Sequence, residues 1–156
     1  MTEGNSEAGL ELEDILRRLE EARQGLMDAI QECDEDRFAV EAEDTESVKR
    51  ALERTADDLD FYYGSLTARA LTLPQPPGLQ RADFSSMREA AMALQVAHRR
   101  FANLLHDVLP ADLEKAASGD DHGAYTLRQV LEMATAQYSY RAQQVKRIAA
   151  QTAQRR

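Results

Sequence analysis

"TLRQVLEMATAQYSYRAQQVKRI", residues 126–148, carries apolar side chains at three- and four-residue steps, which is the spacing of an amphipathic helix. Arg141 falls within this apolar stripe, and Gln137 lies on its flank. A guanidinium and an amide on the core face of a helix need polar partners, because burying such groups unpaired is costly. This face is therefore the first candidate for a site. The stripe consists of Leu127, Val130, Leu131, Ala134, Tyr138, Val145 and Ile148.

The same spacing predicts three more helices, over 12–33, 46–70 and 86–109. Each of them has one apolar face, which must be buried against the other helices. The expected inward positions are Leu12, Leu16, Leu19, Ala22, Leu26, Ala29, Ile30 and Cys33 in the first; Val48, Leu52, Thr55, Leu59, Tyr62 and Leu66 in the second; and Met87, Ala91, Leu94, Phe101, Leu105 and Val108 in the third.

Capping signals mark where several of these helices begin. A Ser or Thr side chain at the N-cap accepts a bond from the first turn, and a Glu or Gln three residues later can return it. Pro110 ends the third helix. The expected caps are Asp44 or Thr45, Ser86 with Glu89, and Thr126 with Gln129.

The connection "TLPQPPGLQ", residues 72–80, cannot be helical, because it holds three prolines and a glycine. It predicts a long crossover between the second and third helices. No stretch alternates in the manner of a strand, so we expect no β-sheet. The sequence therefore predicts an all-α fold, a four-helix bundle. We expect this bundle to form a single domain over 11–150, with a flexible N-terminus over 1–10 and a flexible tail over 151–156.

Composition narrows the classes of function. Residues 1–60 hold 20 acidic and 7 basic side chains, and the whole chain has a net charge of −9, so we expect no nucleic-acid partner. No apolar run approaches the roughly 20 residues of a membrane span, and we expect no membrane association. The start of the chain lacks the pattern of a secretory signal. With Cys33 as the single cysteine, these features fit a cytoplasmic protein.

The common chemistries of helical bundles are missing from the sequence. No Glu-x-x-His pair, His-x-x-x-His pair or His-Glu-x-x-His motif occurs, so no metal site is predicted from spacing. His98 lies near the apolar stripe of the helix over 86–109, where it is either a buried histidine with one partner or part of a pocket. Tyr62, in "DFYYG", is either a core residue or the lip of a pocket.

The order of the segments resembles the DinB/YfiT-like family of four-helix bundles. The resemblance rests on "AIQECDEDRF", "DTESVKRALERTADDLDFYYGSL" and "GAYTLRQVLEMATAQYSYRAQQVKRI", and it covers about residues 10 to 150. The matching frame is Ser47, Val48, Leu52, Asp57, Tyr62, Thr126, Leu127, Leu131, Gln144 and Val145.

The resemblance sets the family's three metal-binding histidines at Arg54, Gln137 and Arg141. Arginine stays protonated and has no lone pair for a metal, and an amide is a weak ligand, so we expect neither a metal nor another cofactor. Two arginines facing one cavity would repel each other without an anion. The anion is either internal, from side chains such as Asp57, Asp58 or Glu132, or it is a bound ligand; alternatively, Arg54 reaches solvent.

Three hypotheses of function follow. The first is a non-catalytic protein that binds a partner or a small anionic molecule through Arg54 and Arg141, with Gln137, Tyr138, Tyr62 and His98 completing the site. In the second, the resemblance implies a hydrolase or a thiol-dependent transferase, which would have to act without metal or with a relocated site. The third is an interaction module that forms a homodimer through an apolar face such as Phe61 beside Leu66.

Overall fold

The computed structural model describes residues 2–41, 46–75, 77–118 and 124–153, which are mostly helical. The all-α class predicted from the sequence is confirmed. The α-helices are α1 (Thr2–Glu32), α2 (Val48–Asp58), α3 (Gly64–Leu71), α4 (Met87–Leu104) and α5 (Leu127–Ala153). A π-helical segment, Leu59–Tyr63, joins α2 to α3, and short 3-10 turns cover Glu35–Arg37 and Pro110–Glu114.

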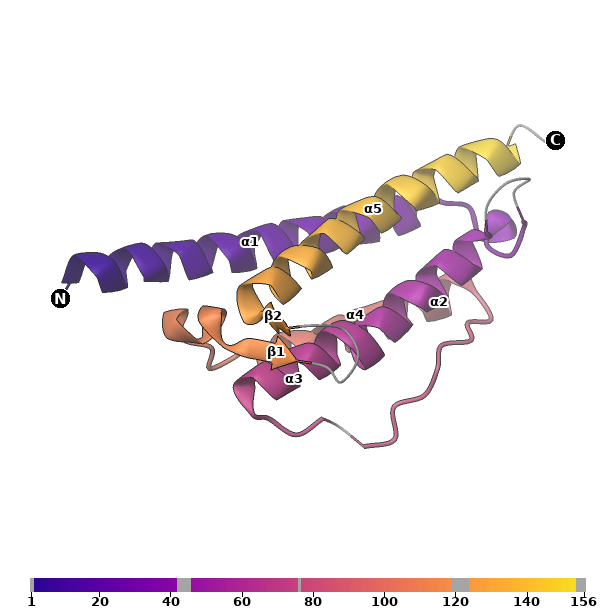
Figure 1. Ribbon diagram of the computed structural model, residues 1–156. Coiled ribbons are helices and arrows are strands. Elements are labelled where there is room, and N and C mark those ends of the chain that lie inside the picture. The colour runs from indigo at the N-terminus through magenta and orange to yellow at the C-terminus, as the bar shows by residue number, and fades with distance from the viewer. Residues whose placement is uncertain (1, 42–45, 76, 119–123, 154–156) are drawn as a thin grey trace.

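The first and last helices lie side by side and run in the same direction (Figure 1). The α2–α3 segment and α4 run in the opposite direction, and α2 contacts both α4 and α5. Two neighbouring parallel helices cannot be joined by a tight turn, so the connection from α3 to α4 has to return along the molecule. This explains the long crossover that the prolines predict.

One apolar core joins all the α-helices, and the predicted stripes supply most of it. Every apolar position predicted for the last helix is buried, while Leu16, Ala22, Tyr62, Ala91 and Val108 are only partly buried. The helices differ in extent from the prediction. α1 begins at Thr2, α4 ends at Leu104, short of residue 109, and α5 continues to Ala153.

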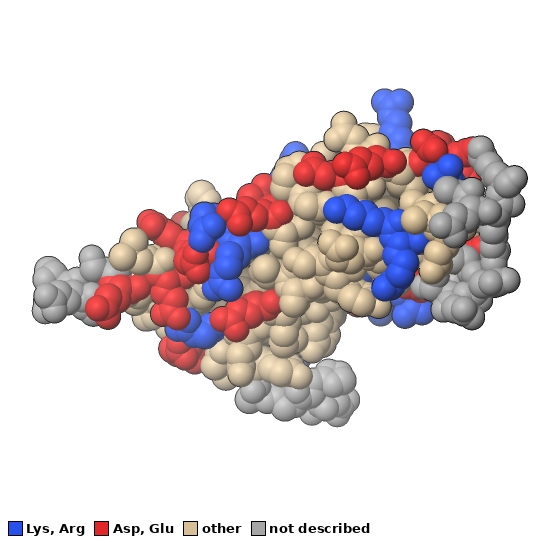
Figure 2. Space-filling model, turned by 90° about the horizontal axis from the view of Figure 1, so that it is seen from above, with Lys and Arg blue, Asp and Glu red and all other residues tan. Residues whose placement is uncertain are grey.

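The outer surface of α1 mixes both signs of charge, as Figure 2 shows. Arg17 pairs with Asp14 and Glu21 on this surface, and Arg23 pairs with Glu20. No helix among the described residues has the length and hydropathy needed to cross a membrane.

The helix caps agree with the capping signals in two of three cases. Ser86 accepts a hydrogen bond from the Glu89 amide, and Thr126 and Gln129 bond each other reciprocally. The helix over 48–58 is instead capped by Ser47, whose hydroxyl accepts from the Arg50 amide at 3.1 Å. The predicted caps Asp44 and Thr45 lie outside the described residues.

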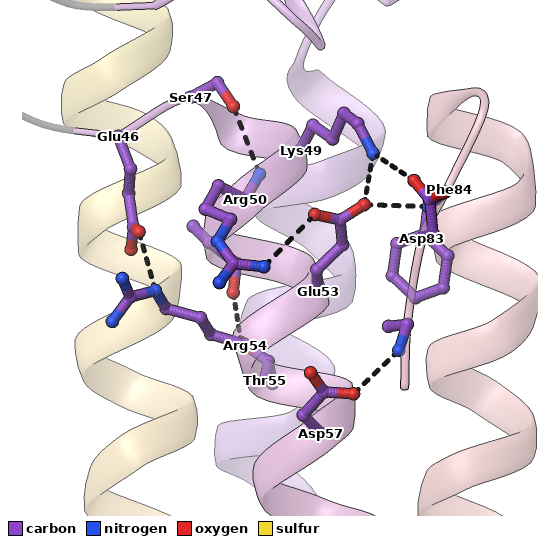
Figure 3. Close-up of polar contacts among 12 residues, drawn as sticks. Glu46, Ser47, Lys49, Arg50, Glu53, Arg54, Thr55, Asp57, Asp83 and Phe84 are labelled. Atoms are coloured by element: carbon purple, nitrogen blue, oxygen red, sulfur yellow. Dashed lines mark hydrogen bonds and ion pairs between the residues drawn. The ribbon is translucent and has the colours of Figure 1, made fainter. Parts of the chain in front are cut away.

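The crossover is fastened to α2 by carboxylates (Figure 3). Asp57 accepts from the Ala82 amide and Glu53 from the Phe84 amide, both at 2.8 Å. Lys49, also on α2, pairs with Asp83 of the crossover at 2.9 Å. Because alternate amides point the same way in an extended segment, carboxylates one helical turn apart can hold both.

The expectation that the chain has no β-sheet is wrong. Ala116–Ser118 (β1) and Ala124–Thr126 (β2) pair as an antiparallel hairpin, with Ala117 opposite Tyr125. Three-residue strands are too short to display a period of two, so the sequence pattern missed them. β1 packs beside α3, and β2 leads directly into α5.

Candidate functional site

The arginine cluster, formed by Arg54, Gln137 and Arg141 with the carboxylates Glu46 and Asp58, lies between α2 and α5. Arg141 and Gln137 stand one turn apart on α5, and Arg54 projects from α2. The Arg141 side chain is 12% exposed, whereas that of Arg54 is 54% exposed. The cluster therefore reaches from the edge of the core to the surface.

Glu46 joins the two arginines through one carboxylate. Its Oε2 lies 2.8 Å from Nε of Arg54 (Figure 3), and its Oε1 lies 3.4 Å from Nη1 of Arg141. Nη1 of Arg141 also donates to Oε1 of Gln144 at 2.8 Å. Nε of Arg141 is buried and has no hydrogen-bond partner within the described part of the chain.

Asp58 supplies the second carboxylate of the cluster. Its Oδ2 lies 3.9 Å from Nη2 of Arg141 and accepts a hydrogen bond from the Gln137 amide. The carbonyl oxygen of Gln137 accepts from the Tyr63 hydroxyl. Burial, together with the charge of Asp58, raises the pKa of Tyr63 to about 12, so this hydroxyl remains a donor at neutral pH.

The cluster is thus balanced in charge, with two guanidiniums against two carboxylates. Of the carboxylates proposed from the sequence, Asp58 contacts Arg141, while Asp57 is used by the crossover and Glu132 is exposed. The arginines and amides do not fit a metal ion, because guanidiniums repel cations and each is already paired with a carboxylate. No group of three His, Cys, Asp or Glu side chains arranged for a metal occurs among the described residues.

Tyr63 takes the position in this cluster that the sequence assigned to Tyr62. The π-helical segment adds a residue to one turn, so the helix faces rotate between α2 and α3. Gly64 permits this turn, because a Cβ at that position would lie 2.6 Å from the Leu59 carbonyl oxygen. Tyr62 is half-buried and packs edge-on against the Tyr63 ring, with ring centroids 5.0 Å apart.

His98 and Tyr138 form a second polar group, with residues of α1. Nδ1 of His98 lies 2.7 Å from the Tyr138 hydroxyl, and its Nε2 lies 3.5 Å from Glu20. Burial, reinforced by the charge of Arg23, lowers the pKa of His98 to about 4. Burial also raises the pKa of Tyr138. Tyr138 is buried and His98 is partly buried, so this pair is a packing contact between α4 and α5.

The structure therefore divides the predicted site. Arg54, Gln137 and Arg141 come together, whereas His98 and Tyr138 belong to the contact with α1 and α4. Sequence reasoning missed Glu46, Asp58 as the partner of Gln137, and Tyr63. Of these, only Glu46 carries a signal, since it directly precedes the capping Ser47 and is thus held at the start of α2.

Comparison with known proteins gives no significant match, whether to protein-family models, to curated proteins or to solved structures.

Proposed function

We propose that the chain is a DinB-like four-helix bundle without a catalytic metal site, and that its arginine cluster binds a small carboxylate-bearing molecule. The direction of the helices and the crossover between α3 and α4 support the fold assignment. The gathering of Arg54, Gln137 and Arg141 supports the correspondence with the family's metal positions, because Arg54 comes from α2 and the other two residues come from α5.

The position of Glu46 is the observation that carries the proposed ligand class. Its two oxygens contact different arginines, so Arg54 and Arg141 stand at a spacing that suits one carboxylate. A ligand carboxylate that displaced Glu46 would meet the same guanidiniums and also the free Nε–H of Arg141. Glu46 then acts as an internal competitor, and Gln144 orients the ligand from α5.

Isothermal titration with succinate, citrate and phosphate tests this proposal. We expect the natural chain to bind a carboxylate, and Glu46→Gln to bind it at least tenfold more tightly, because the internal competitor loses its charge. Arg54→Gln should weaken binding at least tenfold and, as a half-exposed side chain, it can be changed without opening the core.

Arg50→Gln is the matched control, because Arg50 lies on the same helix with a side chain 53% exposed but pairs with Glu53. Its binding should equal that of the natural chain. If neither the natural chain nor Glu46→Gln binds any of the three anions, the cluster is an internal salt-bridge network and the proposal is wrong. Binding by Glu46→Gln alone would also contradict a ligand-binding role for the natural chain.

A further inference from the structure

A groove of about 530 Å³ separates the second half of α1 from the first half of α4. α1 packs mainly along α5, while α4 packs on α2 and α3, so the two helices flank the groove with few contacts of their own. Its volume falls within the range of small-molecule sites, which is roughly 300–1,000 Å³. The groove contains none of the residues of the arginine cluster.

The lining of the groove combines apolar side chains with polar ones. Met27 and Ile30 of α1 face Met87 and Ala91 of α4, and Ile30 and Met87 belong to the core. Methionine side chains adapt their shape to apolar ligands. The exposed amides of Gln31 and Gln95 stand at the rim. This combination suits a molecule with an apolar body and a polar end.

The charges around the groove favour an anionic end. The lining holds two arginines, Arg23 and Arg88, and one carboxylate, Glu35, in a chain that is otherwise acidic. Arg23 is paired with Glu20, and Glu35 accepts a hydrogen bond from the Met87 amide at 2.9 Å. Arg88 is exposed and has no ion-pair partner within the described ranges, so its charge is available to a ligand.

We infer that this groove binds an amphipathic monoanion, with its apolar body against Met27, Met87 and Ala91 and its charged group at Arg88. The site is separate from the arginine cluster and takes a different class of ligand, because a small polar carboxylate has no apolar body to bury. Either site can fail without the other.

The test uses the fluorescent monoanion 8-anilino-1-naphthalenesulfonate and the full chain. We expect a saturable fluorescence increase that dodecanoate reverses at least tenfold more effectively than dodecanol, its uncharged counterpart. Arg88→Glu should weaken binding of the dye at least tenfold. Arg99→Glu, the same change of charge at an exposed position of α4 outside the lining of the groove, should not.

A second pair of variants locates the dye, because Arg88 also borders a shallow hollow on the other side of α4, beside Met92 and Val96. Ala91→Trp fills the groove and should abolish binding, whereas Ala93→Trp fills the hollow and should not. No dye binding, equal competition by dodecanol and dodecanoate, or loss of binding only in Ala93→Trp would each overturn the inference. Arg54→Gln should leave dye binding unchanged, which separates this result from that for the arginine cluster.

Discussion

His98 shows how one partly buried residue can make the stability of the fold depend on pH. In the fold it faces Glu20 and Arg23 from α1 and Tyr138 from α5, and its pKa is lowered to about 4. An unfolded histidine has a pKa of about 6.5, so between these two values the unfolded chain binds a proton that the fold does not. The contribution of His98 to stability is therefore fully present above about pH 6.5 and decreases as the pH falls towards 4.

We expect His98→Gln to remove this pH dependence while keeping a side-chain partner for the Tyr138 hydroxyl. Between pH 7 and pH 5, the free energy of unfolding of the natural chain should fall by about 1 to 2 kcal/mol more than that of the variant. Urea unfolding at both pH values measures the difference. His106→Gln is the control, because the His106 side chain is 83% exposed. If the free energy of unfolding fell equally between pH 7 and pH 5 in the natural chain and in His98→Gln, His98 would have the same pKa in the fold as in the unfolded chain.

The crossover between α3 and α4 is held in place by a few side chains of α2. Glu53, which is 4% exposed, accepts from the Phe84 amide and also pairs with Lys49. Glu53→Ala leaves a buried amide without an acceptor, so we expect the free energy of unfolding to fall by about 2 to 3 kcal/mol. Denaturant unfolding measures the loss, and hydrogen exchange should show faster exchange at the Phe84 amide.

Asp83→Ala is the matched change on the crossover, because Asp83 pairs with the same Lys49 that pairs with Glu53. The Asp83 side chain is 92% exposed, and a surface ion pair of this kind contributes about 0 to 1 kcal/mol. Its effect on the free energy of unfolding should therefore be much smaller than that of Glu53→Ala. Comparable losses from the two variants would mean that the ion pair with Lys49, and not the bond to the amide, holds the crossover.

Apolar periodicity predicted the helices because each buries one continuous stripe, as the fully buried stripe of α5 illustrates. The same reasoning could not find the contacts that fasten the crossover, since their acceptors, Glu53 and Asp57, lie outside the apolar stripe of α2 and their donors are backbone amides of no particular residue type. The π-helical turn was missed as well. Its one additional residue rotates the helix faces that follow it, so Tyr63 and not Tyr62 contacts the arginine cluster.

The residues of the candidate site on α5 could be predicted from the sequence, but their partners on other segments could not. Arg141 and Gln137 could be identified because they interrupt an apolar stripe, and a polar residue on a core face must have a partner. The identity of the partners depends on the packing of α2 against α5. Asp58 was therefore named from the sequence only as one of several possible acidic partners, and Glu46 was not named among them.

The oligomeric state is a question for the whole molecule, and the homodimer expected from the sequence stays a prediction. The apolar face suggested for it is smaller than the sequence implies, because Leu66 lies in the core and the Arg81 guanidinium lies 4.1 Å from the centroid of the Phe61 ring. Phe61→Glu should therefore leave the molecular mass measured by light scattering unchanged. A natural chain of dimeric mass and a variant of monomeric mass would place the interface at Phe61.

The continuous core predicts that the whole molecule unfolds as one unit. Leu26 of α1 is 1% exposed and belongs to the same cluster as the inner faces of α2, α4 and α5. Leu26→Ala should lower the free energy of unfolding by about 2 to 5 kcal/mol, with coincident transitions in far-ultraviolet circular dichroism and tyrosine fluorescence. Leu10→Ala, on the same helix but 66% exposed, should change it by less than about 0.5 kcal/mol. If the two probes separated in Leu26→Ala, α1 would be unfolding before the tyrosine-bearing helices, and the core would consist of two units.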